Sequence, residues 1–119
     1  MSATGNKDMK NGTGTCLQDT YRWLMTTTER QQSNCTIIHA LVTRISDKLV
    51  HPHAVIYEKE TNRIHEVSNS FKGRGKNVVL PFEFWKNLGN VTQIKHYTAR
   101  EMTAKLLETK MWDFYHLTD

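Results

Sequence analysis

The amino-acid sequence predicts one small α+β domain, in which an N-terminal helix packs on an antiparallel meander sheet of about four strands, with a short helical insertion and a closing C-terminal helix. The chain has 119 residues, the size of a single ordinary domain. Apolar residues recur at helical spacing near both ends, whereas the middle consists of short β-branched runs separated by turn residues. Strands grouped between helices indicate the α+β class.

The first helix is expected to begin close to the first cysteine. Residues 1–14 are polar and show no periodicity, so we expect a disordered tail there and a single domain over residues 15–119. After Cys16 the apolar residues fall at i, i+4 and i+7, which places them on one helical face. Asp19 lies in the first turn, where the positive end of a helix favours a carboxylate.

The central part of the chain predicts three strands. Residues 35–45 are apolar on both faces and rich in β-branched side chains, which is typical of a central strand. Residues 53–58 and 63–68 are two further runs of this kind. The turn residues between them predict a hairpin in which residue 58 pairs with residue 63.

The last third predicts a fourth strand and two helical segments. Residues 78–80 form a short strand or an extended edge, and Pro81 opens a helical turn. Residues 91–97 are expected to form the fourth strand. Residues 98–101 form a capping box, Thr followed three positions later by Glu, which opens the closing helix. We expect the aromatic residues in 111–115 to close the core.

The overall charge favours no partner strongly. Sixteen Lys and Arg against twelve Asp and Glu give a net charge of +4, and the basic residues are scattered. Lys72, Arg74 and Lys76 form the one basic cluster; it could contact phosphates, but we interpret it as a solvated loop. The chain has no apolar stretch long enough to span a bilayer and no signal-like N-terminus, so we expect a cytoplasmic protein without a membrane partner.

The two cysteines are expected to differ in chemistry. A structural disulfide is uncommon in cytosolic proteins. The sequence contains no CxxC motif of the kind that binds zinc, so no cofactor is expected. Cys16 falls at a helix start after a Gly-rich approach, where the helix dipole and free backbone N–H groups stabilise a thiolate. We therefore expect Cys16 to be an accessible, reactive thiol. Cys35 begins an apolar strand and is expected to be an inert core residue.

A thiol nucleophile needs a nearby imidazole, and the imidazole needs an orienting group. His53 opens a strand directly after Pro52, where its side chain can lie beside a helix N-terminus. In the predicted hairpin the odd separation between His53 and Glu66 places both side chains on one face of the sheet. Asn69 would point to the opposite face unless a bulge intervenes. Glu66 is therefore the predicted third residue, and Asn69 is kept as the alternative.

Two other kinds of site were weighed. His51 and His53, together with His39, His65 and Cys35, could in principle bind zinc or copper, but the pleat places His65 opposite the face assigned to His53. We therefore expect no metal site. Basic residues with nearby aromatic side chains could recognise nucleic acid, but helical spacing favours core packing for such residues. The aromatic residues in question are Phe82, Trp85, Tyr97 and Tyr115.

Three segments together resemble the papain-like superfamily in its transglutaminase-like branch. They are residues 16–21 (CLQDTY), 53–57 (HAVIY) and 64–68 (IHEVS), and the likeness spans roughly residues 15–97. The resemblance lies in the order of the parts: a Cys at a helix start, a strand, His-Ala at the head of a second strand, and an acid on a third. It implies a papain-like fold.

The resemblance also implies a role for each residue of the site. Cys16 would be the nucleophile, His53 the general base and Glu66 the orienting acid. The chain departs from the usual pattern at Val55, where Trp is commonest, and at Glu66, where Asp usually stands and is about two residues further from the His. The expected activity is that of a thiol-dependent hydrolase or acyltransferase that acts on a peptide, isopeptide or amide bond.

The expected partner is accordingly a peptide or protein substrate. The alternative is a catalytically inactive papain-like domain that serves as a binding module, with nucleic acid as a less favoured partner for the basic cluster.

Overall fold

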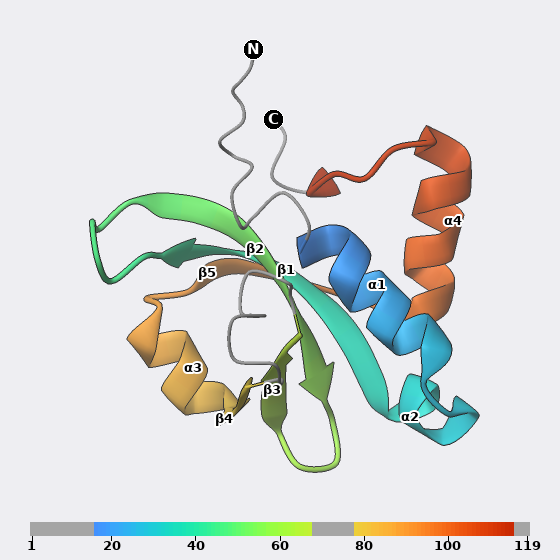
Figure 1. Ribbon diagram of the computed structural model, residues 1–119, viewed down its shortest axis with the longest axis horizontal. Helices are drawn as coiled ribbons and strands as arrows, with labels where there is room; N and C mark the ends of the chain where they lie inside the picture. Colours follow the sequence, from blue (N-terminus) through green and yellow to red (C-terminus); the bar gives the residue numbers. More distant parts are fainter. Residues whose placement is uncertain (1–15, 68–77, 116–119) are drawn as a thin grey trace.

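In the computed structural model, which describes residues 16–67 and 78–115, the chain forms an antiparallel five-stranded sheet and four helices (Figure 1). The expected tail of residues 1–14 lies outside these ranges, and no helix within them is long and apolar enough to cross a bilayer. The elements in chain order are α1 (Cys16–Thr26), α2 (Glu29–Asn34), β1 (Cys35–Thr43), β2 (Val50–Glu58), β3 (Arg63–Glu66), β4 (Val78–Pro81), α3 (Phe82–Leu88), β5 (Thr92–Tyr97) and α4 (Ala99–Thr109).

The sheet is a meander over only four of its five strands. Its order is β4-β3-β2-β1-β5, so the first four strands are neighbours in sequence and β5 lies at the opposite edge, against β1. The prediction of a simple meander of about four strands is therefore wrong at its end. The physical reason is the position of α3, which lies between β4 and β5 in the chain. Its buried Trp85 packs on the sheet, so the chain crosses from the β4 edge to the β1 edge before β5 begins.

A second helix was missed between the first helix and the first strand. Residues 31–34, for which no helix or strand was predicted, belong to α2. The threonines at positions 26–28 have weak helix propensity; α1 ends at the first of them, and the last is the N-cap of α2. The Thr28 side chain accepts a hydrogen bond from the Gln31 backbone N–H at 3.2 Å, which is the typical N-cap contact.

Two apolar cores lie on the opposite faces of the sheet. Successive residues of a strand point to opposite faces, and the buried Ile37 and Ile38 of β1 accordingly belong to different cores. The α1-side core contains Leu24, Cys35, Ile37, Ile56, Tyr97 and Met102. The α3-side core contains Ile38, Ala40, Val42, Val55, Ile64, Trp85 and Val91.

The closing helix and the residues after it complete the α1-side core. The capping box at the start of α4 is confirmed, with Thr98 and Glu101 bonded to each other's backbone N–H groups. The ring of Phe114 packs on His39 with the centroids 5.0 Å apart, and Tyr115 packs on the same core. Trp112 contacts Tyr21 edge-on and stays 38% exposed, so the aromatic segment closes the core only in part.

Candidate active site at the start of α1

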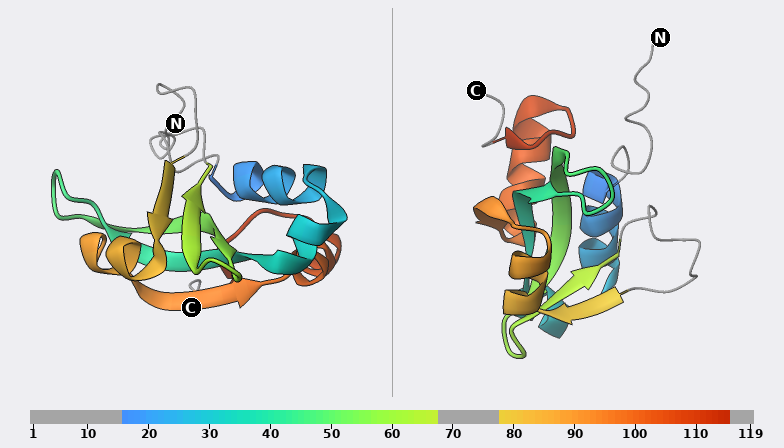
Figure 2. Two further views of the ribbon diagram at one scale, coloured as in Figure 1. Left: turned by 90° about the horizontal axis from the view of Figure 1, so that it is seen from below. Right: turned by 90° about the vertical axis from the view of Figure 1, so that its left-hand side faces the viewer.

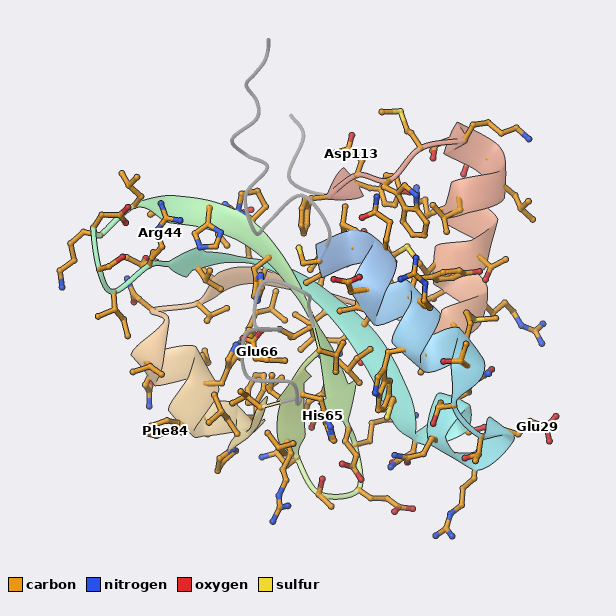
Figure 3. The ribbon with its side chains drawn as sticks, viewed as in Figure 1. Glu29, Arg44, His65, Glu66, Phe84 and Asp113 are labelled. Atoms are coloured by element: carbon orange, nitrogen blue, oxygen red, sulfur yellow. The ribbon has the colours of Figure 1, made fainter. Side chains whose placement is uncertain are left out.

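His53 and Glu66 form a buried, hydrogen-bonded pair. The hairpin register pairs Glu58 with Arg63 and Ile56 with His65, which is the register predicted from the turn. This register brings His53 of β2 and Glu66 of β3 together on one face, with His53 Nε2 2.7 Å from Glu66 Oε1. Each residue is only 7% exposed. Glu66 lies near the centre of the molecule, beside α3 (Figure 3). The predicted partnership is confirmed, and the alternative, Asn69, lies outside the described residues.

Trp85 holds the other oxygen of the same carboxylate. Its indole N–H, on α3, donates a hydrogen bond to Glu66 Oε2 at 3.0 Å. Sequence reasoning assigned Trp85 to core packing, which its 4% exposure confirms, but it did not predict this bond. Only half of the signal lay in the sequence: a buried indole N–H needs an acceptor. That the strand preceding α3 pairs with the strand that carries Glu66 is known only from the structure.

Cys16 is the first residue of α1, which packs mainly on β2 among the strands. The first turn is fixed by the buried Thr20 hydroxyl, which donates to the Cys16 carbonyl oxygen at 3.0 Å. Among the described residues, β3 pairs with residues 56–58 of β2 and not with the part of β2 that carries His53. Figure 2 shows β3 and β4 bending away from the plane of the central strands, on the same side as α1.

The Cys16 thiol contacts the His53 ring. A hydrogen bond between the two side chains contributes to the ionisation of His53. Nε2 is bound to Glu66, so the ring nitrogen available to the thiol is Nδ1, which is buried and has no other hydrogen-bond partner among the described residues. One part of the prediction is wrong: Cys16 was expected to be accessible, but it is fully buried at 0% exposure. The reason is that α1 packs on β2, and the thiol interacts with the buried His53 of that strand.

The contacts of His53 favour its charged form. Burial of the ring is the largest single influence and lowers its pKa, because a charged group loses hydration. The charge of Glu66 acts in the opposite direction, and the hydrogen bonds to Cys16 and Glu66 and the charge of Cys16 add to it. Together they raise the pKa of His53 from 6.5 to about 10. At neutral pH the imidazole is therefore protonated, between a carboxylate and a thiol.

Cys35 has the properties of an inert core thiol. It is 1% exposed in the α1-side core. Burial, the largest cause, and the charge of Glu58 raise its pKa to about 11, with Lys59 acting in the opposite direction. Since the thiolate is the reactive form, this environment suppresses chemistry at Cys35. The prediction of a buried core residue is thus confirmed for Cys35, whereas the predicted difference in exposure between the two cysteines is wrong.

The histidines do not converge on a metal site. His65 points to the face opposite His53 and bonds Glu58, with Nε2 2.8 Å from Oε1. His39 packs against the rings of Tyr97 and Phe114 in the α1-side core. Within the described residues no group of three or more His, Cys, Asp or Glu side chains is placed to hold a metal ion.

The aromatic residues weighed as a nucleic-acid surface are mostly packed inside. Trp85 and Tyr97 are each 4% exposed, and Phe82 and Tyr115 are partly buried against the two cores. The basic cluster of Lys72, Arg74 and Lys76 lies outside the described residues.

The candidate site therefore consists of one thiol, one imidazole and one carboxylate in line, with an indole behind the carboxylate. Comparison with known proteins adds no relative: no family model matches the chain, and neither a curated protein nor a solved structure matches it significantly.

Proposed function

We propose that the protein is a thiol-dependent hydrolase or acyltransferase that uses Cys16 as nucleophile, His53 as acid and base, and Glu66 to orient and charge His53. The proposal is carried by one observation: the buried His53 ring interacts with the Cys16 thiol and is hydrogen-bonded through Nε2 to the Glu66 carboxylate. A nucleophile, a base within reach of it, and a third group that orients the base are the parts that acyl transfer through a thiol requires.

The first half of the reaction forms a thioester. The reaction starts from the Cys16 thiolate, with the thiol proton held on His53 Nδ1. The sulfur attacks the carbonyl carbon of an amide, isopeptide or ester, and as the bond to the leaving nitrogen or oxygen breaks, the proton on Nδ1 passes to that atom. Negative charge that develops on the carbonyl oxygen faces the first turn of α1, whose backbone N–H groups have no intrahelical partner. The leaving group departs as a neutral amine or alcohol, and the acyl group stays on sulfur.

The second half returns the free thiol. Neutral His53 takes a proton from a water molecule or an acceptor amine, whose oxygen or nitrogen attacks the thioester carbon. The carbon–sulfur bond breaks, and the thiolate pairs again with the protonated imidazole. Throughout, Glu66 stabilises the imidazolium and fixes its Nε2–H, which leaves Nδ1 for the sulfur. Water as acceptor gives hydrolysis, and an amine gives transfer.

A general acyl donor tests this chemistry without knowledge of the natural substrate. We expect p-nitrophenyl acetate to release one equivalent of p-nitrophenolate rapidly and to leave an acetyl thioester on the Cys16 peptide, detectable by mass spectrometry of acid-quenched protein. Cys16→Ala and His53→Ala should abolish the burst. Cys35→Ala is the matched control and should retain it. A burst that survives Cys16→Ala, or an acetyl group found on Cys35 instead, would contradict the proposal.

The burial of Cys16 favours one second candidate. Cys16 has no exposed surface. This is expected of a catalytically inactive domain that keeps the three residues only as a buried polar contact and serves as a binding module. The same experiment separates the two functions, because a binding module gives no burst in the wild-type protein. In that case His53→Ala should lower the melting temperature, and the release of p-nitrophenolate should be the same as in the wild-type protein.

A further inference from the structure

We infer that Trp85 is a positioning residue of the proposed site: its indole N–H holds the Glu66 carboxylate in the orientation from which Glu66 supports the His53 imidazolium. This inference rests on the proposed function, because it assigns Trp85 a role in the same site. It adds a fourth member, contributed by α3, to the three that the sequence predicted.

The geometry shows why a carboxylate in this place needs a second partner. Glu66 is 7% exposed, so water cannot fix its orientation. One oxygen, Oε1, is 2.7 Å from His53 Nε2, and the other, Oε2, is 3.0 Å from Trp85 Nε1. With both oxygens bound to partners on two different elements, the carboxylate cannot rotate about its terminal bond without breaking both hydrogen bonds.

The Trp85 side chain is fixed by the packing around it, unlike a hydrogen-bond donor on the protein surface. Its ring is 4% exposed within the α3-side core and lies 6.0 Å from the ring of Phe82. The indole N–H donates a hydrogen bond and cannot accept one, unlike a hydroxyl group. A carboxylate oxygen that faces it can only accept from it, and this bond fixes which of the two Glu66 oxygens faces the imidazolium.

The experiment measures how fast iodoacetamide alkylates Cys16 between pH 5 and pH 10. Peptide mass spectrometry reads Cys16 and Cys35 separately, so Cys35 reports global unfolding in the same sample. Trp85→Phe keeps the aromatic ring and removes the donor. Val91→Ala is the packing control, since Val91 is buried in the same core without any polar contact to the site. His53→Ala tests the proposed function in parallel.

Trp85→Phe should slow Cys16 alkylation about tenfold near pH 6, since a hydrogen bond to a charged group is worth about one pH unit or more. The rate should return to the wild-type value at pH 10, where a thiol ionises without help. Val91→Ala should leave the shape of the profile unchanged. A Trp85→Phe profile that matches the wild type, while His53→Ala removes the reactivity near pH 6, would overturn the role of Trp85 alone. If His53→Ala leaves the profile unchanged, the proposed function fails and this inference with it.

A measurement on the unmodified protein keeps the inference testable if Trp85→Phe does not fold. In a 13.9 kDa protein the indole N–H of Trp85 and the ring signals of His53 can be followed by nuclear magnetic resonance. Both should shift with one common pH midpoint, because one carboxylate lies between them. An indole signal of Trp85 that does not respond where His53 does would show that the two are uncoupled and would overturn the inference.

Discussion

The proton on His53 couples the stability of the fold to pH. The pKa of His53 is raised from its ordinary value of 6.5 to about 10, so the folded state binds this proton more tightly than the unfolded state does. The resulting stabilisation is fully present below about pH 6.5 and is lost as the pH rises toward 10. We expect the free energy of unfolding, measured with urea, to fall steadily from pH 7 to pH 9.

The double variant His53→Gln/Glu66→Gln is the control for this prediction, because it keeps two polar side chains and removes both charges. Its stability should be nearly flat between pH 7 and pH 9. The raised pKa of Cys35 destabilises the fold only above about pH 9, and it does so equally in both proteins. A wild-type stability that does not change from pH 7 to pH 9 would show that His53 is neutral in the folded state.

Glu66→Gln tests the charge of the third residue separately from its shape. The amide has nearly the same size but cannot stabilise an imidazolium by its charge. Once a substrate is known, we expect kcat to fall at least about tenfold with little change in KM, because the charge is needed for the chemical step more than for binding. Glu66→Asp, which keeps the charge on a shorter side chain, should retain more activity than Glu66→Gln. The opposite order would mean that shape matters more than charge.

The three residues of the candidate site were proposed from local rules that the sequence carries. The partner of His53 follows from strand parity, since an odd separation across a hairpin places two side chains on one face. The contact of Trp85 with Glu66 could not be derived in this way, because it depends on how α3 packs across the sheet. The burial of Cys16 was missed for a similar reason, since exposure depends on what packs around a helix start.

Helices and strands could be predicted where the sequence pattern fits only one kind of element. The hairpin of β2 and β3 and the capping box of α4 were predicted with the correct register and residues. The place of β5 was not, because the pattern of a strand does not specify which edge it joins. The pairing of β5 with β1 also contains a register shift between His39 and Leu41, where Gln93 has a positive φ of 55°, and no local pattern announces such a bulge.

The capping box of α4 gives a prediction at the scale of one element. Thr98→Ala removes the hydroxyl that accepts from the Glu101 backbone N–H at 3.0 Å, and N-cap losses of this kind cost about 1 kcal/mol. Arg100→Ala is the matched control, because Arg100 is an exposed residue of the same turn and is not part of the capping box. The midpoint of urea unfolding should fall for Thr98→Ala and stay within error for Arg100→Ala. Equal effects would mean that the cap contributes nothing.

At the scale of the whole molecule, the candidate site joins the two faces of the sheet. Cys16 is contributed by α1, which packs on one core, whereas Glu66 and Trp85 lie on the side of α3 and the other core. The sheet is shared, because alternate residues of β1 and β2 serve both cores. A site assembled in this way holds its geometry only while both helices stay docked. We therefore expect the two cores to unfold together.

The tryptophans provide a reporter on each side for this last prediction: Trp23 of α1 packs on one core, and Trp85 of α3 lies within the other. Their indole N–H signals should lose the native position at the same urea concentration. Leu24→Ala on the α1 side and Ile38→Ala on the α3 side each delete a fully buried side chain, and such changes cost about 2–5 kcal/mol. Each variant should lower the midpoint of both signals equally. If Leu24→Ala releases Trp23 at a urea concentration where Trp85 remains native, the helix that carries Cys16 can undock alone, and the site is then held by α1 more weakly than by the sheet.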